Sequence, residues 1–333
     1  MALIGWSSSW VDTVRPVKAA IRAYMRDQLA HYFATAAEVN ATSTAVTKAI
    51  LIGGAPFILD AADVTTADDG VNVIVSSDGG RYKRASVARE KLVANRTYYV
   101  RTDGSDANGG LANTAAGAFL TIQKAIDVAC ALDLSIYSTT VNVGAGTFAK
   151  FTCKPYVGTG PISIVGASTT IDVAAGVGVT AYDAGSWQVS GITWSNSANT
   201  IHAKGRTSLT INGTMTYGAA SNAHILAENG AIVTATADYT IAGSSPTHIQ
   251  SVGALVDIAG RTITLTGTPA WSFTMVYVSG LGRLKAFSNT FTGAATGRRF
   301  IVEDNGLIRL NGGGANYFPG DVAGLQLTGG QYV

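Results

Sequence analysis

Apolar residues recur every three or four positions between Trp10 and Phe33, the spacing that places them on one side of an α-helix. Such a helix cannot bury its stripe against itself, so we expect it to pack on this subunit, on symmetry mates or on a docking partner. Four cations follow the same spacing on another face, and they form either a docking ridge for an acidic partner or an ordinary solvated face. These cations are Arg15, Lys18, Arg22 and Arg26.

A small β module is predicted after this helix. Residues 34–49 are rich in Ala and Thr and indicate a linker or a frayed end of the helix. Apolar runs at 50–52, 57–59 and 71–75, with Asp-Gly turn signals at 69–70 and 78–79, predict short strands. A basic cluster follows, which we interpret as a strand edge that charge protects from pairing. Its members are Arg81, Lys83, Arg84, Arg89 and Lys91.

A second helix is predicted over residues 119–132, after a short β run at 98–100. Its apolar residues fall on one face, and Thr121 is placed to cap its N-terminus. The turn-rich stretch before it contains Asp103, Asp106 and Asn108. It lacks the alternating ligands and the distal Glu of an EF-hand, so we favour an ordinary turn over a calcium site.

Beyond residue 140 the helical period disappears, and short apolar runs alternate with Gly, Ser and Asn. Two series of glycines recur at intervals in the twenties, which is the mark of an internal repeat. The first series is Gly185, Gly205, Gly230, Gly253, Gly282 and Gly306. The second series is Gly218, Gly243, Gly267, Gly293 and Gly320.

Each repeat is too short to close a core, so the repeats must stack and bury a shared inward column, as a solenoid does. We therefore predict a mainly β chain that ends in a right-handed parallel β-helix of six coils. An antiparallel sandwich is the alternative, but it would not need two glycine series of common period. The helix at 119–132 lies where the open end of the solenoid needs an α-helical cap. The predicted divisions are 1–46 for attachment, 47–100 for the β module and 101–333 for the capped β-helix.

Composition narrows the range of functions. Charged residues make up only 13% of the chain against about 25% in an average domain, and the net charge is +2. This balance argues against nucleic acid as a partner. We identify neither an 18-residue apolar run nor a signal peptide, so we expect neither membrane insertion nor secretion. With only Cys130 and Cys153 in the chain, buried free thiols are favoured over a disulfide.

Carboxylates are the first candidates for chemistry, because glycoside hydrolysis needs two of them about 5 to 9.5 Å apart. Asp183 and Glu228 precede glycines of the first series by two residues, so they are in phase at about 9.6 Å over two coils. Glu303 and Asp304 lie three coils further on. These acids equally suit hydrogen bonding within turns, and we favour that role over catalysis.

Aromatic side chains are the candidates for stacking on sugar rings, although large aromatics more often pack where they are covered. The candidates are Trp187, Trp194, Trp271 and Tyr277. His224 and His248 share a place in successive coils, but two ligands do not specify zinc. We find no phosphate loop and no nucleophile elbow, and we predict neither a metal nor a cofactor.

The segment YYVRTDGSDANGGLANTAAGAFLTIQKAIDVA at 98–129, followed by glycine-phased coils, resembles the tail-fibre and tailspike proteins of tailed bacteriophages. The preceding DGVNVIVSSDGGRYKRAS at 69–86 is similar to the β module often found ahead of such helices. The resemblance implies a homotrimer in the virion, attached through its N-terminal part, with the β-helix facing the host surface. The chain differs from large tailspikes in ending soon after the last coil.

The sequence therefore favours a structural, non-enzymatic subunit of a virion appendage that recognises a host surface, with glycan as the expected ligand. The expected partners are the chain itself and other virion proteins. A polysaccharide depolymerase, either a hydrolase or a lyase, is one alternative, although the sequence shows no cluster of acids with a nearby basic residue. A decoration protein of the head or tail that binds no host is the other alternative.

Overall fold

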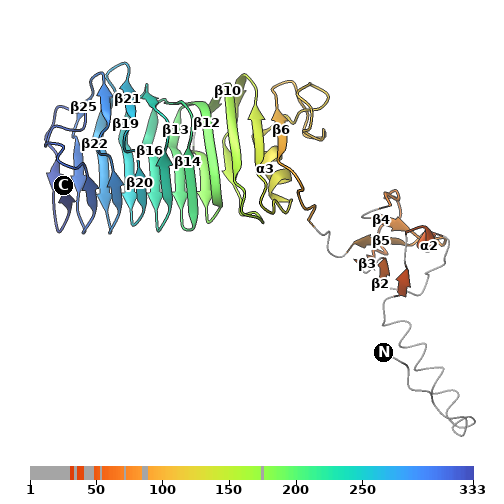
Figure 1. Ribbon diagram of the computed structural model, residues 1–333. Helices are drawn as coiled ribbons and strands as arrows, with labels where there is room; N and C mark the ends of the chain where they lie inside the picture. Colours follow the sequence, from red (N-terminus) through yellow and green to blue (C-terminus); the bar gives the residue numbers. More distant parts are fainter. Residues whose placement is uncertain are drawn as a thin grey trace, which may run out of the picture. The chain divides into compact units, whose positions relative to one another are not determined.

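The computed structural model describes residues 31–33, 36–40, 49–52, 55–70, 73–84, 89–173 and 176–333. The chain divides into two compact units, Met1–Ala88 and Arg89–Val333 (Figure 1). The predicted helix from residue 10 falls outside the described residues up to position 30, and so do Arg15, Lys18, Arg22 and Arg26. Their docking role stays a prediction.

The first unit contains a five-stranded sheet in the order β1-β2-β3-β5-β4. Only β1 and β2 pair in parallel, and the other neighbours are antiparallel. A short helix, α2 (Ala36–Asn40), follows β1. The strands are β1 (His31–Phe33), β2 (Ala49–Ile52), β3 (Ala55–Leu59), β4 (Val73–Val75) and β5 (Arg81–Arg84).

Two expectations for this region need correction. The stripe predicted a helix through Phe33, but residues 31–33 are extended because they pair with β2. The predicted linker includes α2, whose Val39 is fully buried with Ile50 and Phe57. The two compact units meet at 88/89, whereas the sequence indicated divisions at 46/47 and 100/101. Val39 belongs to the core of the first unit, and residues 96–100 pair with a strand of the second unit.

Three members of the basic cluster, Arg81, Lys83 and Arg84, do not lie on a sheet edge, because they are in β5, between β3 and β4. Lys83 Nζ lies 2.8 Å from a carboxylate oxygen of Asp60 and 2.9 Å from one of Asp63. Arg89 donates to the carbonyl of Cys130 at the end of the second predicted helix. These cations therefore bind groups of their own chain.

The second unit is a parallel β-solenoid with three faces, and its coils follow one another along the axis in Figure 1. Every strand pair of these faces within the described residues is parallel, which excludes the antiparallel sandwich. The long strands β10 (Ile162–Asp172) and β12 (Gly185–Ser195) bend and contribute to both the first and the second face.

The first face is completed by β6 (Arg96–Val100), β7 (Thr139–Val143), β14 (Thr207–Ile211), β17 (Ile232–Ala235), β20 (Leu255–Asp257), β23 (Arg283–Lys285), β27 (Leu307–Arg309) and β29 (Gln331–Tyr332). The second face is completed by β8 (Gly146–Phe148), β15 (Met215–Tyr217), β18 (Tyr239–Ile241), β21 (Thr262–Leu265) and β24 (Thr290–Thr292). The third face consists of β9 (Phe151–Cys153), β11 (Val177–Tyr182), β13 (Ser197–Lys204), β16 (Ala220–Glu228), β19 (Ser245–Val252), β22 (Ala270–Ser279), β25 (Thr296–Gly297), β26 (Phe300–Val302) and β28 (Leu325–Gln326).

Inward residues of successive strands form continuous apolar columns, which explains why single repeats are not stable alone. On the first face the described strands give a column of nine positions, more than the six coils predicted. The column is Thr139, Ile162, Trp187, Leu209, Val233, Val256, Leu284, Ile308 and Tyr332.

The two glycine series mark the corners, but they do so for two different reasons. Gly230 has a φ of 90°, a left-handed conformation that side chains disfavour. Gly218 is needed for space, since a Cβ there would lie 2.2 Å from the carbonyl oxygen of Trp194 in the preceding coil. The first series is not in strict register, because Gly185 pairs with Thr207 and not with Gly205.

The predicted cap is present as α3 (Ile122–Cys130), with Thr121 as its N-cap residue. The helix buries Ile122, Ala125 and Ile126 in the same core as the coils. Its Gln123 side chain accepts from the backbone N–H of Thr152 in β9 and donates to the carbonyl of the same residue, at 2.8 and 3.3 Å. The helix thus both covers the apolar end and satisfies backbone groups of an edge strand.

Candidate functional site

The outward side of the third face carries the main grouping of polar and aromatic side chains that we consider for function. Two outward columns run along it, at alternate positions of each strand. The first is Thr180, His202, Leu226, Gln250, Tyr277, Ile301 and Leu325. The second is Tyr182, Lys204, Glu228, Val252 and Ser279.

Tyr182, His202 and Glu228, from three successive coils, form a hydrogen-bonded chain that we call the relay. The Tyr182 hydroxyl lies 2.6 Å from His202 Nδ1, and His202 Nε2 lies 2.7 Å from Glu228 Oε2. Because a carboxylate only accepts, Nε2 of a neutral imidazole carries the proton and Nδ1 accepts from the phenol. The relay is therefore directional, from phenol to imidazole to carboxylate.

The surroundings of the relay define its electrostatics. Burial raises the pKa of Tyr182, and the charge of Glu228 adds to this effect, so the phenol is neutral at rest. Tyr182 is 42% exposed, which leaves its ring accessible from solvent. In the strand register Lys204 lies opposite Tyr182 on one side and Glu228 on the other, and it is itself exposed. A cation thus lies one strand from the phenol.

A second grouping lies three coils further along the same face. The Tyr277 hydroxyl donates to Glu303 Oε1 at 2.6 Å, and the Phe273 ring lies 5.5 Å from the Tyr277 ring. Phe273 is 46% exposed, and Gln250 is the strand partner of Tyr277. We call Gln250, Phe273, Tyr277 and Glu303 the aromatic patch. It combines an exposed ring with a carboxylate and an amide.

The acids proposed from the sequence do not come together as a catalytic pair. Asp183 has a φ of 48° at a corner, and its Oδ1 accepts from the backbone N–H of Arg206 at 2.9 Å. Asp304 is exposed at another corner with a φ of 50°. Glu303 lies three coils from Glu228, about 14 Å at the spacing of strands and beyond the reach of a two-carboxylate mechanism. Of the four acids, Glu228 and Glu303 contact other functional side chains.

Three of the four aromatic candidates are buried, which removes them from contact with a ligand. Trp187, Trp194 and Trp271 are at most 3% exposed, and the Trp187 indole N–H donates to the carbonyl of Ala184 at 2.9 Å. Burial removes these tryptophans as candidates for stacking on sugar, and they fill the solenoid core, in line with the preference of large aromatics for covered positions. Only Tyr277 remains on the surface.

The repeated histidines are also internal. His224 Nε2 lies 2.8 Å from the carbonyl of Gly218, and its Nδ1 lies 3.0 Å from Nδ1 of His248. The Tyr239 hydroxyl lies 3.0 Å from His248 Nε2. Both imidazoles are fully buried and surrounded by aromatic rings. Among the described residues, no group of three or more His, Cys, Asp or Glu side chains is arranged to hold a metal ion.

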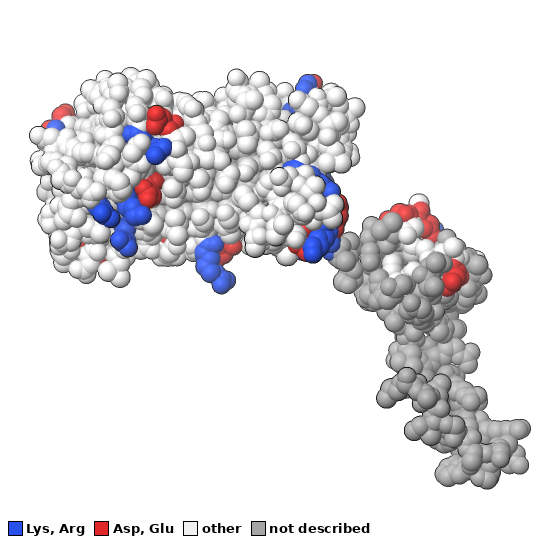
Figure 2. All heavy atoms as spheres, viewed as in Figure 1, with Lys and Arg blue, Asp and Glu red and all other residues white. Residues whose placement is uncertain are grey.

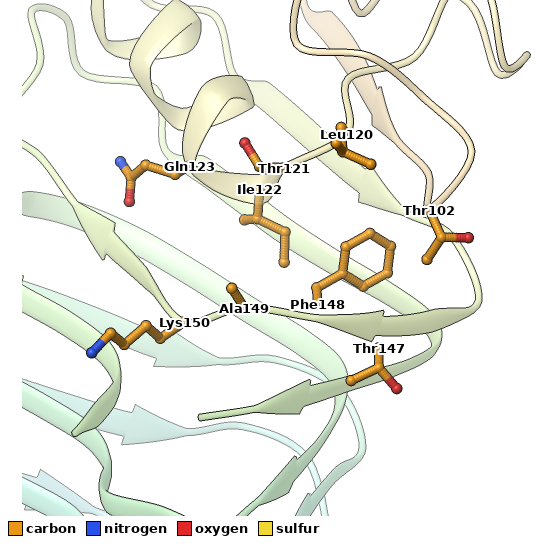
Figure 3. A pocket seen from close by; sticks show the side chains of 9 residues that line it. All are labelled: Thr102, Leu120, Thr121, Ile122, Gln123, Thr147, Phe148, Ala149 and Lys150. Carbon is orange, nitrogen blue, oxygen red and sulfur yellow. The ribbon is translucent and has the colours of Figure 1, made fainter. Parts of the chain in front are cut away.

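A hollow of about 350 Å³ lies between the start of α3 and strand β8, lined by residues 120–123, residues 147–150 and Thr102 (Figure 3). Gln123 and Lys150 lie at one side of it, and Thr102 and Thr147 lie at the other. The helix start is already occupied, because Asp106 accepts from the backbone N–H groups of Leu120 and Thr121. The Asp106 carboxylate therefore takes the place that an anionic ligand would need.

Sequence reasoning missed Tyr182 and His202, and the reason is a slip of one residue. Aligning on glycines placed Asp183, Ala203 and Glu228 in one column, but the strands pair Tyr182, Lys204 and Glu228. Since side chains alternate between faces, a one-residue slip exchanges outward for inward positions. The coil-length spacing of Tyr182, His202 and Glu228, at 20 and 26 residues, was the available signal.

Comparison with known proteins bears on the first unit. Residues 28–87 match the family model of the phage tail protein small four-stranded beta-sheet domain. A tail domain of this kind joined to a parallel β-solenoid fits a phage tail-fibre or tailspike-like protein. No curated protein and no solved structure matches the chain.

The match also bears on where the protein belongs. The tail domain implies a component of the virion and fits a structural tail appendage. Neither α2 nor α3, the helices of the described residues, has the length or the apolar character that crossing a bilayer requires. On the side shown in Figure 2, charged side chains form small groups on a solenoid surface that is otherwise uncharged.

Proposed function

We propose that the chain is a tail-fibre or tailspike subunit that attaches to the virion through its N-terminal region and contacts a host-surface glycan with the third face of its solenoid. The aromatic patch carries the proposal. An exposed ring such as Phe273 offers an apolar surface to the C–H face of a sugar, while Glu303 and Gln250 offer hydrogen bonds to its hydroxyls.

The sparsely charged surface agrees with an uncharged, hydroxyl-rich ligand. With 13% charged residues, the chain has little to steer a strongly charged polymer over long distances. Repeated outward columns at a constant spacing also suit a ligand that is itself a repeating chain. Assembly as a homotrimer belongs to the same proposal, and sedimentation analysis of the purified full chain would test it.

Binding of purified host surface polysaccharide to immobilised full-length protein tests the glycan contact. We expect Phe273→Ala and Tyr277→Ala each to weaken binding about tenfold, the effect of losing a central aromatic anchor. Ile232→Ala is the matched control, since Ile232 is 41% exposed on the first face. Equal affinity of all three variants would reject the aromatic patch as the contact.

Attachment is tested by removing residues 1–88 and measuring incorporation into particles. This cut leaves the second unit whole, whereas a cut after residue 46 would remove Val39 from the core of the first unit. We expect the truncated chain to stay folded and to be absent from purified particles. Normal incorporation would refute attachment through the N-terminal region. If the full-length protein incorporates normally but binds no polysaccharide, it would instead be a decoration protein.

A further inference from the structure

Five asparagines of the second unit are followed directly by glycine, a pair in which the next backbone nitrogen can attack the asparagine side chain. Glycine has no Cβ to shield its N–H group, and its backbone turns freely. Whether the attack occurs depends on how the folded chain holds the two groups that react. The five are Asn108, Asn212, Asn229, Asn305 and Asn311.

In four of these pairs the fold engages one of the two groups. The N–H groups of Gly230 and Gly306 donate to backbone carbonyls at 2.7 and 2.8 Å. The side-chain amide of Asn108 donates to two backbone carbonyls at 2.9 and 2.8 Å, and that of Asn212 donates to Gln188 Oε1 at 2.8 Å. Each of these hydrogen bonds opposes the movement that brings the nitrogen to the side-chain carbon.

The fifth pair, Asn311 and Gly312, has both groups available. Both residues are exposed, and neither the Gly312 N–H nor the Asn311 amide nitrogen has a hydrogen-bond partner among the described residues. A Cβ built at Gly312 meets no atom within 4 Å, so the space around this position is open. Two further glycines follow at 313 and 314, and they ease rotation of the backbone into the geometry of attack.

The Asn311 side chain is also polarised by a cation. Arg309 Nε donates to Asn311 Oδ1 at 2.9 Å. The Arg309 guanidinium in turn lies 5.5 Å from the centre of the Phe287 ring, which helps to hold it in place. A cation bonded to a carbonyl oxygen stabilises the negative charge that develops there when a nucleophile attacks. Within the described part of the chain, no other asparagine–glycine pair has this arrangement.

We propose that Asn311 is a self-modification site, at which the folded chain converts asparagine into aspartate and isoaspartate with water as the only co-reactant. The proposal does not depend on the glycan contact. It assigns Arg309 the role of stabilising the negative charge on Oδ1, and Gly312 the role of the nucleophile.

In the reaction the Gly312 N–H gives its proton to hydroxide, and the nitrogen forms a bond to Asn311 Cγ. The carbonyl electron pair moves to Oδ1, beside Arg309. The carbonyl then re-forms as the bond to the amide nitrogen breaks, and this nitrogen takes a proton from water and leaves as ammonia. Water opens the resulting cyclic imide at one of its two carbonyls. Opening at one carbonyl gives aspartate, and opening at the other gives isoaspartate.

The new carboxylate would meet a cation that lacks a partner of opposite charge. Within the described residues no carboxylate pairs with Arg309, whereas its strand partner Lys285 pairs with Asp257 at 3.2 Å. Like charges directly opposite each other in a sheet repel, and a carboxylate at position 311 would reduce this repulsion. Figure 2 shows Lys and Arg side chains gathered toward the C-terminal end of the solenoid. The modification would thus lower the positive charge of this end irreversibly.

The test incubates the folded full-length protein in neutral buffer and follows the five pairs by peptide mass spectrometry. We expect Asn311 to lose ammonia at least about tenfold faster than Asn229 and Asn305, the effect of one hydrogen bond that need not break. Arg309→Gln should slow the reaction at Asn311 about tenfold, a modest effect because water screens an exposed charge. Arg283→Gln is the matched control, since Arg283 is exposed on the neighbouring strand, and it should keep the rate.

Unfolding separates the effect of the fold from that of the local sequence. In concentrated urea the five pairs should react at similar rates, and Arg309→Gln should change none of them. If Asn311 keeps its lead in urea, the local sequence makes it reactive and the proposal is wrong. Equal rates at Asn311 and Asn229 in the folded chain, or an unchanged rate in folded Arg309→Gln, would also overturn it. Equal melting temperatures of this variant and the parent would show that the slower reaction is not a change of fold.

Discussion

The Nδ1 atoms of His224 and His248 lie 3.0 Å apart in the interior of the solenoid, so only one of them carries a proton. His224 donates from Nε2 to the carbonyl of Gly218, which leaves its Nδ1 to accept from His248. His248 Nε2 then accepts from the hydroxyl of Tyr239. The network gives every imidazole nitrogen a partner with both rings neutral. Protonation of either ring would add an N–H group for which the network has no hydrogen-bond acceptor.

This network predicts that acid destabilises the solenoid. Burial lowers the pKa of His224 to about 4, and burial together with the neighbouring His224 lowers the pKa of His248. The unfolded chain, with ordinary imidazoles near pKa 6.5, then binds more protons than the folded chain. Between about pH 6.5 and 4 the free energy of unfolding should fall with falling pH, by about 1.4 kcal/mol per pH unit for each histidine.

Urea unfolding of the full chain followed across this pH range measures the effect. His248→Gln should reduce the pH dependence, because one of the two buried imidazoles is gone. Gln250→Ala is the control, since Gln250 is an outward residue of the third face that carries no titratable group, and its pH dependence should equal that of the parent. If His248→Gln shows the same slope as the parent, the buried pair does not cause the acid sensitivity.

Trp187 tests whether the tryptophans belong to the core. Trp187→Ala should lower the free energy of unfolding by about 3 to 5 kcal/mol, because it leaves a cavity and an unpaired carbonyl at Ala184. Phe273→Ala removes an aromatic ring of which 46% is exposed, so its effect on stability should be small. Chemical denaturation of both variants makes the comparison. A Trp187→Ala chain as stable as the parent would contradict its place in the column.

Gly230 and Gly253 test the left-handed corners. Their φ angles are 90° and 59°, so Gly230→Val and Gly253→Val should each cost about 1 to 3 kcal/mol. Gly314→Val is the matched control, since a Cβ at Gly314 meets no atom within 4 Å and its φ is outside the left-handed range. Thermal melting should separate the first two variants from the third. Three equal melting temperatures would argue against strain at these corners.

Asp106 tests the cap. Its carboxylate accepts from the N–H groups of Leu120 and Thr121 and from the Thr121 hydroxyl, all within 2.9 Å. Asp106→Ala should therefore destabilise the start of α3 by about 1 to 2 kcal/mol. Asp103→Ala is the control, because Asp103 pairs with Arg101 on the surface of the same loop. Hydrogen exchange of residues 122–126 should be faster only in Asp106→Ala.

The coil architecture was predictable because it depends on residues whose physical demands are visible in sequence. Glycines at corners and alternating apolar residues in short runs indicated stacked coils, and the α3 cap followed from its apolar face and from Thr121. The extent of the repeat was underestimated because the first face starts at β6, whose residues 96–100 pair with β7 well before the first glycine of the series. Gly218 is required because the backbone of the preceding coil comes too close for a Cβ, whereas Gly230 is required because its φ is left-handed. Glycines with different roles occupy different places in the coil, so an alignment on glycine did not give the strand register.

The site was harder to predict because it depends on register to a single residue. Glu228 was identified, but its partners Tyr182 and His202 appear only when the strands are paired correctly. The tryptophans showed the opposite problem, because sequence shows that a residue is aromatic but not to which side of a three-faced coil it points. In the first unit, the short strand His31–Phe33 was hidden in a helical pattern, since pairing with β2 overrides the local period.

The constant rise of the solenoid has a consequence for how such an appendage changes over time. The relay and the aromatic patch are separated by whole turns of the chain, so gaining or losing one turn would move them apart or together in steps of about 4.8 Å. Intermediate distances are not accessible without breaking the backbone ladder. A solenoid built in this way changes the distance between two outward groups only in whole turns, by duplication or deletion of a segment of roughly two dozen residues.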